Sequence, residues 1–152
     1  MTYSVNFANY TIGEDAYQNV REVCRHYGKK ALLIGGELAL KAGKEKLIQA
    51  LASEIQIVDT VLFIAVYEKV MDGISNGNRV NIEGQMDFFG MGGGKALDTA
   101  KGTAEKAGLP VFTFPTIAAT CAATTALSVV YKEDGNFDSF YFYDKLVPRS
   151  VS

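Results

Sequence analysis

One stretch organises the chain: Gly92-Gly93-Gly94-Lys95-Ala96-Leu97-Asp98-Thr99-Ala100-Lys101. It follows an apolar run of strand length, residues 86–91, and leads into residues 96–107, where small apolar side chains recur at helical spacing. The predicted order is therefore strand, glycine turn, helix. Three consecutive glycines allow positive φ and let a phosphate approach bare N–H groups at the positive end of the helix. With Lys95 as a neighbouring cation, this pattern favours nucleotide or phosphate binding over a plain tight turn.

Asp98 falls in the expected first turn of that helix, where a carboxylate suits the helix dipole and can cap free N–H groups. The glycine spacing differs from that of the two commonest phosphate-binding motifs. Lys95 is followed by Ala96, so the stretch is not GxxxxGK[ST], and Gly90, Gly92 and Gly93 lack the separations of GxGxxG.

The stretch resembles instead the GGGKxxDxAK signature of glycerol dehydrogenases, within the iron-containing alcohol dehydrogenase superfamily. Other branches carry serine or an apolar residue after the glycines, so Lys95 narrows the branch. A second segment, PTIAATCAATTALSVVY at 115–131, is similar to PTIASTDAPTSALSVIY of glycerol dehydrogenases. The two motifs stand at the family's separation, and strand and loop lengths are similar throughout residues 1–143.

The composition of this second segment is informative by itself, because it is small, hydroxyl-rich and almost uncharged. Ligands of open α/β sheets bind outside the carboxyl ends of the strands, so the segment is expected to face the same crevice as the glycine turn. Thr116, Thr120 and Thr125 would then donate to phosphate or carboxamide oxygens. The alternative is a buried loop whose hydroxyls satisfy its own backbone.

The resemblance implies roles for individual residues. The cofactor phosphates would be contacted by Gly94 and Lys95. Gly92 and Gly93 of the same turn and Asp98 of the following helix are further candidates for cofactor binding. The nicotinamide half would be lined by Thr116, Ala119, Thr125, Leu127 and Tyr131. Cys121 stands where most family members carry an aspartate that touches the polyol. Cys121 is therefore the candidate substrate contact, and this departure counts against glycerol itself as the substrate.

The resemblance also implies NAD as cofactor and a divalent metal, Zn²⁺ or Fe²⁺, that polarises the alcohol oxygen. Family members hold that metal with an Asp and two His from a second, all-helical domain. Residues 1–152 are thus expected to be the N-terminal NAD-binding domain of a metal-dependent alcohol or polyol dehydrogenase, inactive alone. Two alternatives stay open: a stand-alone nucleotide-binding or regulatory module, and a domain of a glycerol-1-phosphate-dehydrogenase-like or dehydroquinate-synthase-like enzyme. The sequence leaves open whether the chain is a fragment, a truncated gene or an independent protein.

Glu37 follows the apolar run 31–34 and Gly35-Gly36, at the end of a predicted buried strand. An acid at this place in dinucleotide folds can bind the adenosine ribose and repel a 2′-phosphate, which favours NAD over NADP. It can equally be a helix N-terminal acid for a helix over 38–51. The sequence favours neither interpretation.

The remaining periodicity predicts an α/β fold: a Rossmann-like parallel sheet with helices on both faces, plus a C-terminal β-hairpin. Further strands are expected at 3–7, 55–58, 61–67 and 111–114, and further helices at 14–27 and, more weakly, 68–81. The hairpin is expected from 127–132 and 137–143, which flank an Asp-Gly turn. The tail 144–152 lacks periodicity, and its Leu146-Val147-Pro148-Arg149 resembles a protease site, consistent with a processing end.

Composition excludes several classes of function. A formal net charge of −2 and a pI near 5.4 offer no basic field for a nucleic-acid backbone. The sequence predicts neither a leader nor a membrane-spanning run, and the two cysteines, Cys24 and Cys121, are expected to be reduced thiols in a cytoplasmic protein. The single histidine, His26, lacks metal-binding partners nearby. The expected partners are a small alcohol or polyol, with no nucleic acid and no membrane; a homo-oligomer is compatible with this assignment.

Overall fold

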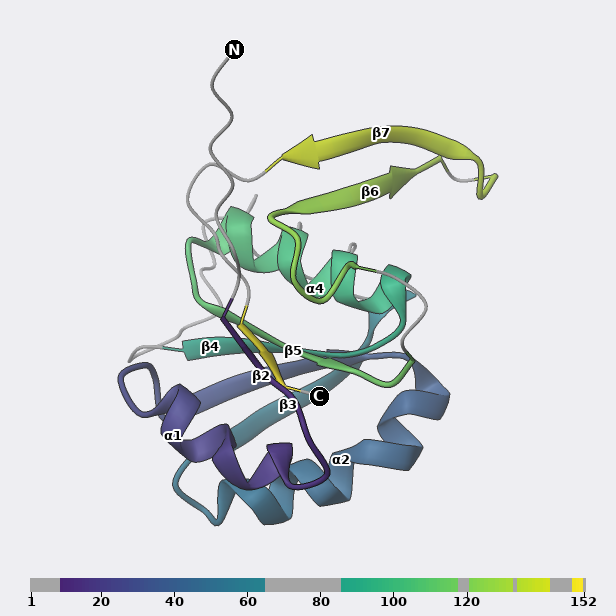
Figure 1. Ribbon diagram of the computed structural model, residues 1–152. Coiled ribbons are helices and arrows are strands. Elements are labelled where there is room, and N and C mark those ends of the chain that lie inside the picture. Colours follow the sequence, from purple (N-terminus) through teal and green to yellow (C-terminus); the bar gives the residue numbers. More distant parts are fainter. Residues whose placement is uncertain (1–8, 65–85, 118–120, 133, 143–148, 152) are drawn as a thin grey trace.

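The computed structural model describes residues 9–64, 86–117, 121–132, 134–142 and 149–151 (Figure 1). A six-stranded sheet in the order β1-β8-β5-β4-β2-β3 forms its centre, and every neighbouring pair in it runs parallel. The strands are β1 (Asn9–Thr11), β2 (Lys30–Gly35), β3 (Gln56–Leu62), β4 (Met86–Gly92), β5 (Val111–Pro115) and β8 (Arg149–Val151). Their carboxyl ends therefore share one edge of the sheet.

Helices cover both faces of this sheet (Figure 1). The 3₁₀-helix η1 (Ala16–Asn19), α1 (Val20–Cys24) and α2 (Glu37–Leu51) pack on one face, and α4 (Gly94–Ala107) packs on the other. The antiparallel pair β6 (Leu127–Tyr131) and β7 (Phe137–Phe142) lies beyond α4. The predicted fold class, with helices on both faces and a hairpin, is confirmed.

The larger core lies between the sheet and the α1–α2 layer. Phe89, Phe112 and Phe114 are fully buried there and meet edge to face, with ring centroids 5.2–5.7 Å apart. Aliphatic side chains from β2 and α2, including Leu33 and Leu47, complete this core. Each such side chain contributes roughly 1.5–3 kcal/mol when it is buried, so this layer supplies much of the stability.

The α4 face is built differently, because small residues bring the helix close to β4. A Cβ at Gly90 would lie only 2.6 Å from the Cβ of Ala100. Ala100 and Ala104 are fully buried against Ile34 and Phe88. Small residues on both β4 and α4 thus allow the helix to pack close to the sheet.

Three local predictions were wrong. The helix expected at 14–27 is a four-residue 3₁₀-helix followed by the five-residue α1. The two strands expected at 55–58 and 61–67 are replaced, in the described residues, by one strand, β3 (Gln56–Leu62), which continues through Asp59 and Thr60. Asp59 and Thr60 do not interrupt β3, because β3 is an edge strand and the polar side chain of Asp59 reaches solvent there. The strand expected at 3–7, the helix expected at 68–81 and residues 65–67 lie outside the described residues.

The third wrong prediction concerns the tail. Residues 149–151 form β8, which inserts between β1 and β5 and buries Ser150 and Val151. A strand of three residues is too short to show an alternating pattern, so sequence periodicity cannot reveal it. The hairpin prediction is confirmed. Its turn contains Gly135 at φ +86° and is closed by the Lys132 N–H, which donates to the Asn136 carbonyl at 2.8 Å.

Candidate functional site

The glycine turn joins the carboxyl end of β4 to the start of α4. Gly92 adopts φ +143°, a conformation that residues with a side chain rarely adopt. Gly93 is the N-cap residue of the helix. A Cβ at Gly92 would lie 3.0 Å from the Cβ of Ala96, and one at Gly93 would lie 3.1 Å from Cδ1 of Ile117. Glycine thus lets Ala96 and Ile117 pack close to the turn, and it leaves the turn without side chains of its own between the N–H groups and a ligand.

Charge at this end of α4 is positive. The first turn of the helix contains no acidic residue, and Gly93 has no side chain that could cap it. Lys95 is exposed at the second position of the helix. The positive end of the helix dipole and the Lys95 ammonium thus act together, and the arrangement suits an anion such as a phosphate.

Neighbouring turns converge on this point. The Thr116 N–H donates to the Gly92 carbonyl at 3.2 Å, which places the loop after β5 beside the glycine turn. The Gly36 N–H donates to the Met91 carbonyl at 3.2 Å, which places the start of α2 on its other side. The structure therefore brings together the turn residues, Thr116 and the helix that begins with Glu37.

Glu37 is the first residue of α2 and the acid of its first turn. Its side chain is 69% exposed, and the Lys41 ammonium lies 3.3 Å from its carboxylate. Beside it is a hollow of about 400 Å³ with Leu40 and Leu62 among its lining. This position suits both interpretations of Glu37, the ribose-binding acid and the acid that complements the helix dipole.

The capping role predicted for Asp98 is wrong. The helix begins at Gly94, two residues earlier than the expected start at Ala96, so Asp98 is its fifth residue and faces the hairpin. Its carboxylate is nearly buried and accepts a hydrogen bond from the Val129 N–H at 3.1 Å. Its other oxygen lies 3.1 Å from Nζ of Lys101. Whether Asp98 also affects the cofactor stays a prediction.

Sequence reasoning missed Lys101, whose side chain is completely buried. Its ammonium donates to the carbonyls of Leu127 at 2.6 Å and Thr125 at 3.1 Å, and it lies 3.3 Å from the Thr125 hydroxyl. Burial lowers the pKa of Lys101, and the Asp98 carboxylate opposes that shift. The signal in the sequence was the pair of opposite charges three residues apart on a helix that is otherwise apolar on this face.

The threonine-rich loop after β5 is only partly described. Thr116 and Cys121 are exposed, Thr125 and Leu127 are half-buried, and Ala119 and Thr120 lie outside the described residues. Thr113 of β5 donates to the Ala123 carbonyl at 2.7 Å, so the loop is tied to the sheet as well as to α4. Tyr131 ends β6, and its side chain also lies outside the described part. The hydroxyl of Thr124 bonds back to the Cys121 carbonyl, as the buried-loop alternative expected for some of these residues.

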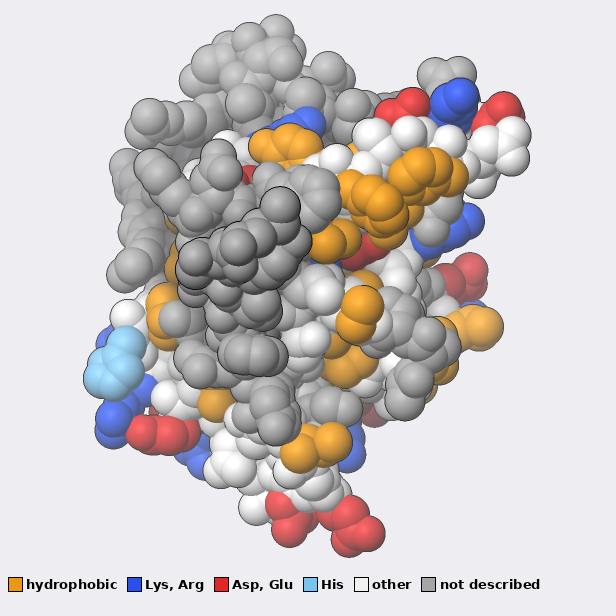
Figure 2. Space-filling model, turned by 45° about the horizontal axis from the view of Figure 1, so that its top comes forward, with side chains coloured by type: hydrophobic (Ala, Val, Ile, Leu, Met, Phe, Trp, Pro, Cys, Tyr) orange, Lys and Arg blue, Asp and Glu red, His pale blue; other side chains and the backbone are white. Residues whose placement is uncertain are grey.

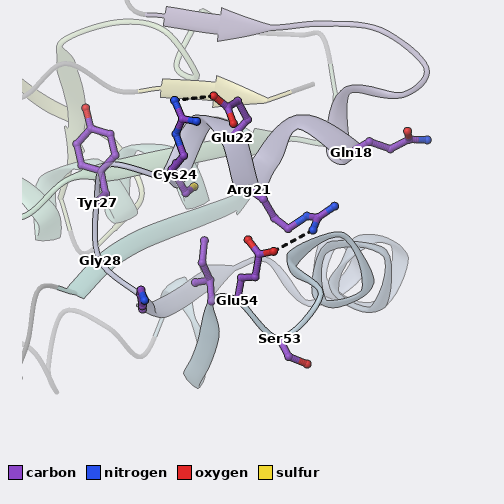
Figure 3. Close-up of a pocket in the computed structure, with 11 residues that line it drawn as sticks. Gln18, Arg21, Glu22, Cys24, Tyr27, Gly28, Ser53 and Glu54 are labelled. Atoms are coloured by element: carbon purple, nitrogen blue, oxygen red, sulfur yellow. Dashed lines mark hydrogen bonds and ion pairs between the residues drawn. The ribbon is translucent and has the colours of Figure 1, made fainter.

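A larger hollow, of about 670 Å³, lies at the opposite end of the strands (Figure 3). It is lined by residues that precede β2 and β3, such as Lys29 and Glu54. Figure 3 shows two ion pairs in its lining. Arg21 lies 3.1 Å from Glu54, and Arg25 lies 3.0 Å from Glu22. Ligands of open α/β sheets bind at the carboxyl ends of the strands, so we place the candidate site at the glycine turn.

The described residues contain neither a cluster of metal ligands nor a membrane-spanning helix. There, no three His, Cys, Asp or Glu side chains lie close enough together to hold a metal ion. The residues in this part of the chain thus do not fit the implied divalent metal, and no metal step is derived for it. None of the helices described is both long enough and apolar enough to cross a membrane.

Comparisons with known proteins bear on the fold and on the family of the chain. A family model described as iron-containing alcohol dehydrogenase matches residues 8–151. The chain is 31% identical to a glycolaldehyde reductase of Halobacterium salinarum and 31% identical to a glycerol dehydrogenase of Citrobacter freundii, in each case over 91% of this chain and 38% of that protein. The crystal structure of a glycerol dehydrogenase from Schizosaccharomyces pombe superposes on all of this chain and on 39% of its own, with a TM-score of 0.77 and 24% identity. The chain thus spans under half the length of these proteins.

Proposed function

The chain belongs to the iron-containing alcohol dehydrogenase family, and on this premise we propose that it binds NAD(H) at the glycine turn. In this proposal it is the nucleotide-binding domain of an alcohol or polyol dehydrogenase. The turn itself carries the proposal. Bare glycines, the positive end of α4 and the exposed Lys95 meet at the carboxyl edge of a parallel sheet, where a pyrophosphate would find N–H donors and a cation.

The two ends of the dinucleotide would extend to either side of the turn. The adenosine half would occupy the hollow beside Glu37, with its ribose hydroxyls on the carboxylate. The nicotinamide half would lie along the loop after β5, toward Thr116, Thr125 and Leu127. The short backbone links from β4 to the start of α2 and to Thr116 support this path, because they hold all three segments at one edge.

We further propose that a second domain covers this edge in the working enzyme and supplies the metal. The carboxyl ends of β1, β2 and β5 are followed by large exposed apolar side chains, Ile12, Leu38 and Ile117. Exposed apolar groups at three places along one edge of the sheet are typical of a surface that another part of the protein covers. A small alcohol or polyol would bind between the two, with Cys121 as the candidate substrate contact on this side.

The glycine-turn site is tested by the exposed lysine. Replacing Lys95 by alanine should weaken NADH binding by about 1.5–3 kcal/mol, because a charge-assisted contact to phosphate is lost. Calorimetric titration of NADH into the parent chain and the variant measures this difference as a change of roughly 10- to 150-fold in Kd.

The matched control is Lys106→Ala, which removes an exposed lysine from the last turn of the same helix. It changes net charge equally but acts at the negative end of the helix dipole, so NADH affinity should stay within about twofold of the parent, as for a surface charge outside the site. Equal affinity of the parent and Lys95→Ala would refute the site.

Cofactor choice is tested at Glu37. NADP should bind worse than NAD, and Glu37→Ser should narrow that gap, since it removes the carboxylate that repels a 2′-phosphate. It would also release the Lys41 ammonium, now 3.3 Å from that carboxylate, to attract the phosphate. Both nucleotides are titrated at one ionic strength, because exposed charges are screened by salt.

Glu45→Ser is the control for this test, because Glu45 lines the same hollow two turns further along α2. It should leave the ratio of the NAD and NADP affinities unchanged. The ribose assignment fails if the parent binds both nucleotides equally well, or if the two serine variants behave alike.

A further inference from the structure

We propose that Lys101 is a positioning residue for the nicotinamide half of the cofactor, and that it acts by holding residues 125–127 in place. The inference rests on the proposed function and goes beyond it, because Lys101 lies beneath the loop rather than in the cleft. Its ammonium is directed at the segment that the cofactor is expected to touch.

The contacts of Lys101 point away from its own helix. Asp98, three residues earlier on α4, is one of its partners. The other acceptors are the carbonyls of Thr125 and Leu127 and the hydroxyl of Thr125, which are 24 and 26 residues away in sequence. An ammonium has three N–H donors, and here they meet a compact set of oxygens from a single short segment.

This segment is the link between the threonine-rich loop and β6. Its near end is tied to the sheet through the Thr113 hydroxyl, which donates to Ala123, and its far end is tied to α4 through Asp98, which accepts from the Val129 N–H. Lys101 binds the part in between. The loop is therefore anchored at three successive points, and the middle anchor lies at two of the residues proposed to line the nicotinamide half.

The need to fill this space does not by itself explain why a charged side chain is buried here. A buried ion pair is often no more stabilising than apolar side chains of the same volume, because two charges must leave water. A methionine would fill the same space without that cost. Unlike a methionine, the ammonium forms directional hydrogen bonds, which fix the orientation of two backbone carbonyls and one hydroxyl. The adenosine half, by contrast, is proposed to meet the glycine turn and α2, whereas the hydrogen bonds described for Lys101 go to residues 125–127.

The test compares two ligands that differ only by the nicotinamide ring. NADH and ADP-ribose share the adenosine, the pyrophosphate and the second ribose, so a change confined to NADH reports on the contacts of the nicotinamide ring. Both are titrated into the parent chain, Lys101→Met, the double variant Asp98→Asn/Lys101→Met, and Ser128→Ala. The double variant removes both charges of the pair and is the one expected to stay folded. NADH fluorescence in each complex gives a second readout of the nicotinamide environment.

In the double variant the Kd of NADH should rise about tenfold, as for the loss of one well-oriented hydrogen bond, while the Kd of ADP-ribose stays within about twofold. The shift of NADH fluorescence on binding should shrink in parallel. Ser128→Ala removes a buried hydroxyl that donates to the Asp98 carbonyl, also between β6 and α4. This variant should leave the affinities for both ligands unchanged.

A parallel loss of both ligands, or no loss of either, would overturn the inference, because Lys101 would then serve the fold alone. A parent chain that binds ADP-ribose as tightly as NADH would also overturn it while leaving the glycine-turn site intact. A parent chain that binds neither ligand would overturn the proposed function as well.

Discussion

The purified 152-residue chain is expected to form no NADH from glycerol, 1,2-propanediol or butanol, with or without added Zn²⁺ or Fe²⁺. Hydride transfer from an alcohol needs the oxygen held and its proton made easier to lose, work that a catalytic metal with three protein ligands can do. The thiols and the imidazole of this chain are poorly placed for that task. Cys24 is buried in the core on the α1–α2 face, His26 is exposed after α1, and Cys121 lies in the loop above the opposite face.

Solvent adds to this expectation. The edge that bears the glycine turn is open to solvent, as its exposed apolar side chains show. Electrostatic contacts to a bound substrate are therefore weakened by water unless another domain covers this edge. A steady-state assay of NADH formation, with each metal in excess, is the direct measurement. Metal-dependent turnover that Cys121→Ala abolishes would show that the catalytic centre lies within this chain.

Removing the Lys101 ammonium should destabilise the fold by about 3–5 kcal/mol, because the nearly buried Asp98 carboxylate then loses its partner. Domains of this size are stable by roughly 5–15 kcal/mol, so Lys101→Met should retain a small margin at best. Urea unfolding followed by circular dichroism measures the change as a lower midpoint at constant slope.

Two variants serve as comparisons for this loss. The double variant Asp98→Asn/Lys101→Met should lose clearly less than Lys101→Met, since no unpaired charge remains and asparagine still accepts from the Val129 N–H. Ser128→Ala should cost about 1 kcal/mol, the contribution of one hydrogen bond. If the double variant is as unstable as the single one, the two charges do not compensate each other and the pair is not the source of the stability.

In the hairpin, the sequence predicted the strands but not which of their side chains would be exposed. Its Asp-Gly turn, between the runs 127–132 and 137–143, predicted β6 and β7 correctly. On its outer side, however, Phe137 and Phe140 are more than half exposed and touch each other with centroids 5.1 Å apart. Figure 2 shows hydrophobic side chains gathered on this part of the surface. A period of two residues reveals that a strand has two faces, but not which face α4 covers.

The sequence by itself determined the strand, glycine turn and helix around Gly92, the neighbouring strands β2 and β5, and the hairpin. These features rest on residues adjacent in the chain: glycines that permit a turn, and apolar spacings that match one kind of element. The position of α4 against β4 also follows from local composition, because Gly90 and Ala100 leave room for close approach.

Only the tertiary structure decided where β8 and the charged pair of the signature belong. Three residues near the end of the chain pair with β1 and β5, and Asp98 turns from the expected cap to the hairpin, with Lys101 beside it. Those choices depend on partners between 24 and about 140 residues away, and a local pattern contains no information about such distant groups. A buried lysine finds its oxygens only after the chain has brought them together, because the cost of leaving water must be met by the whole set of contacts at once.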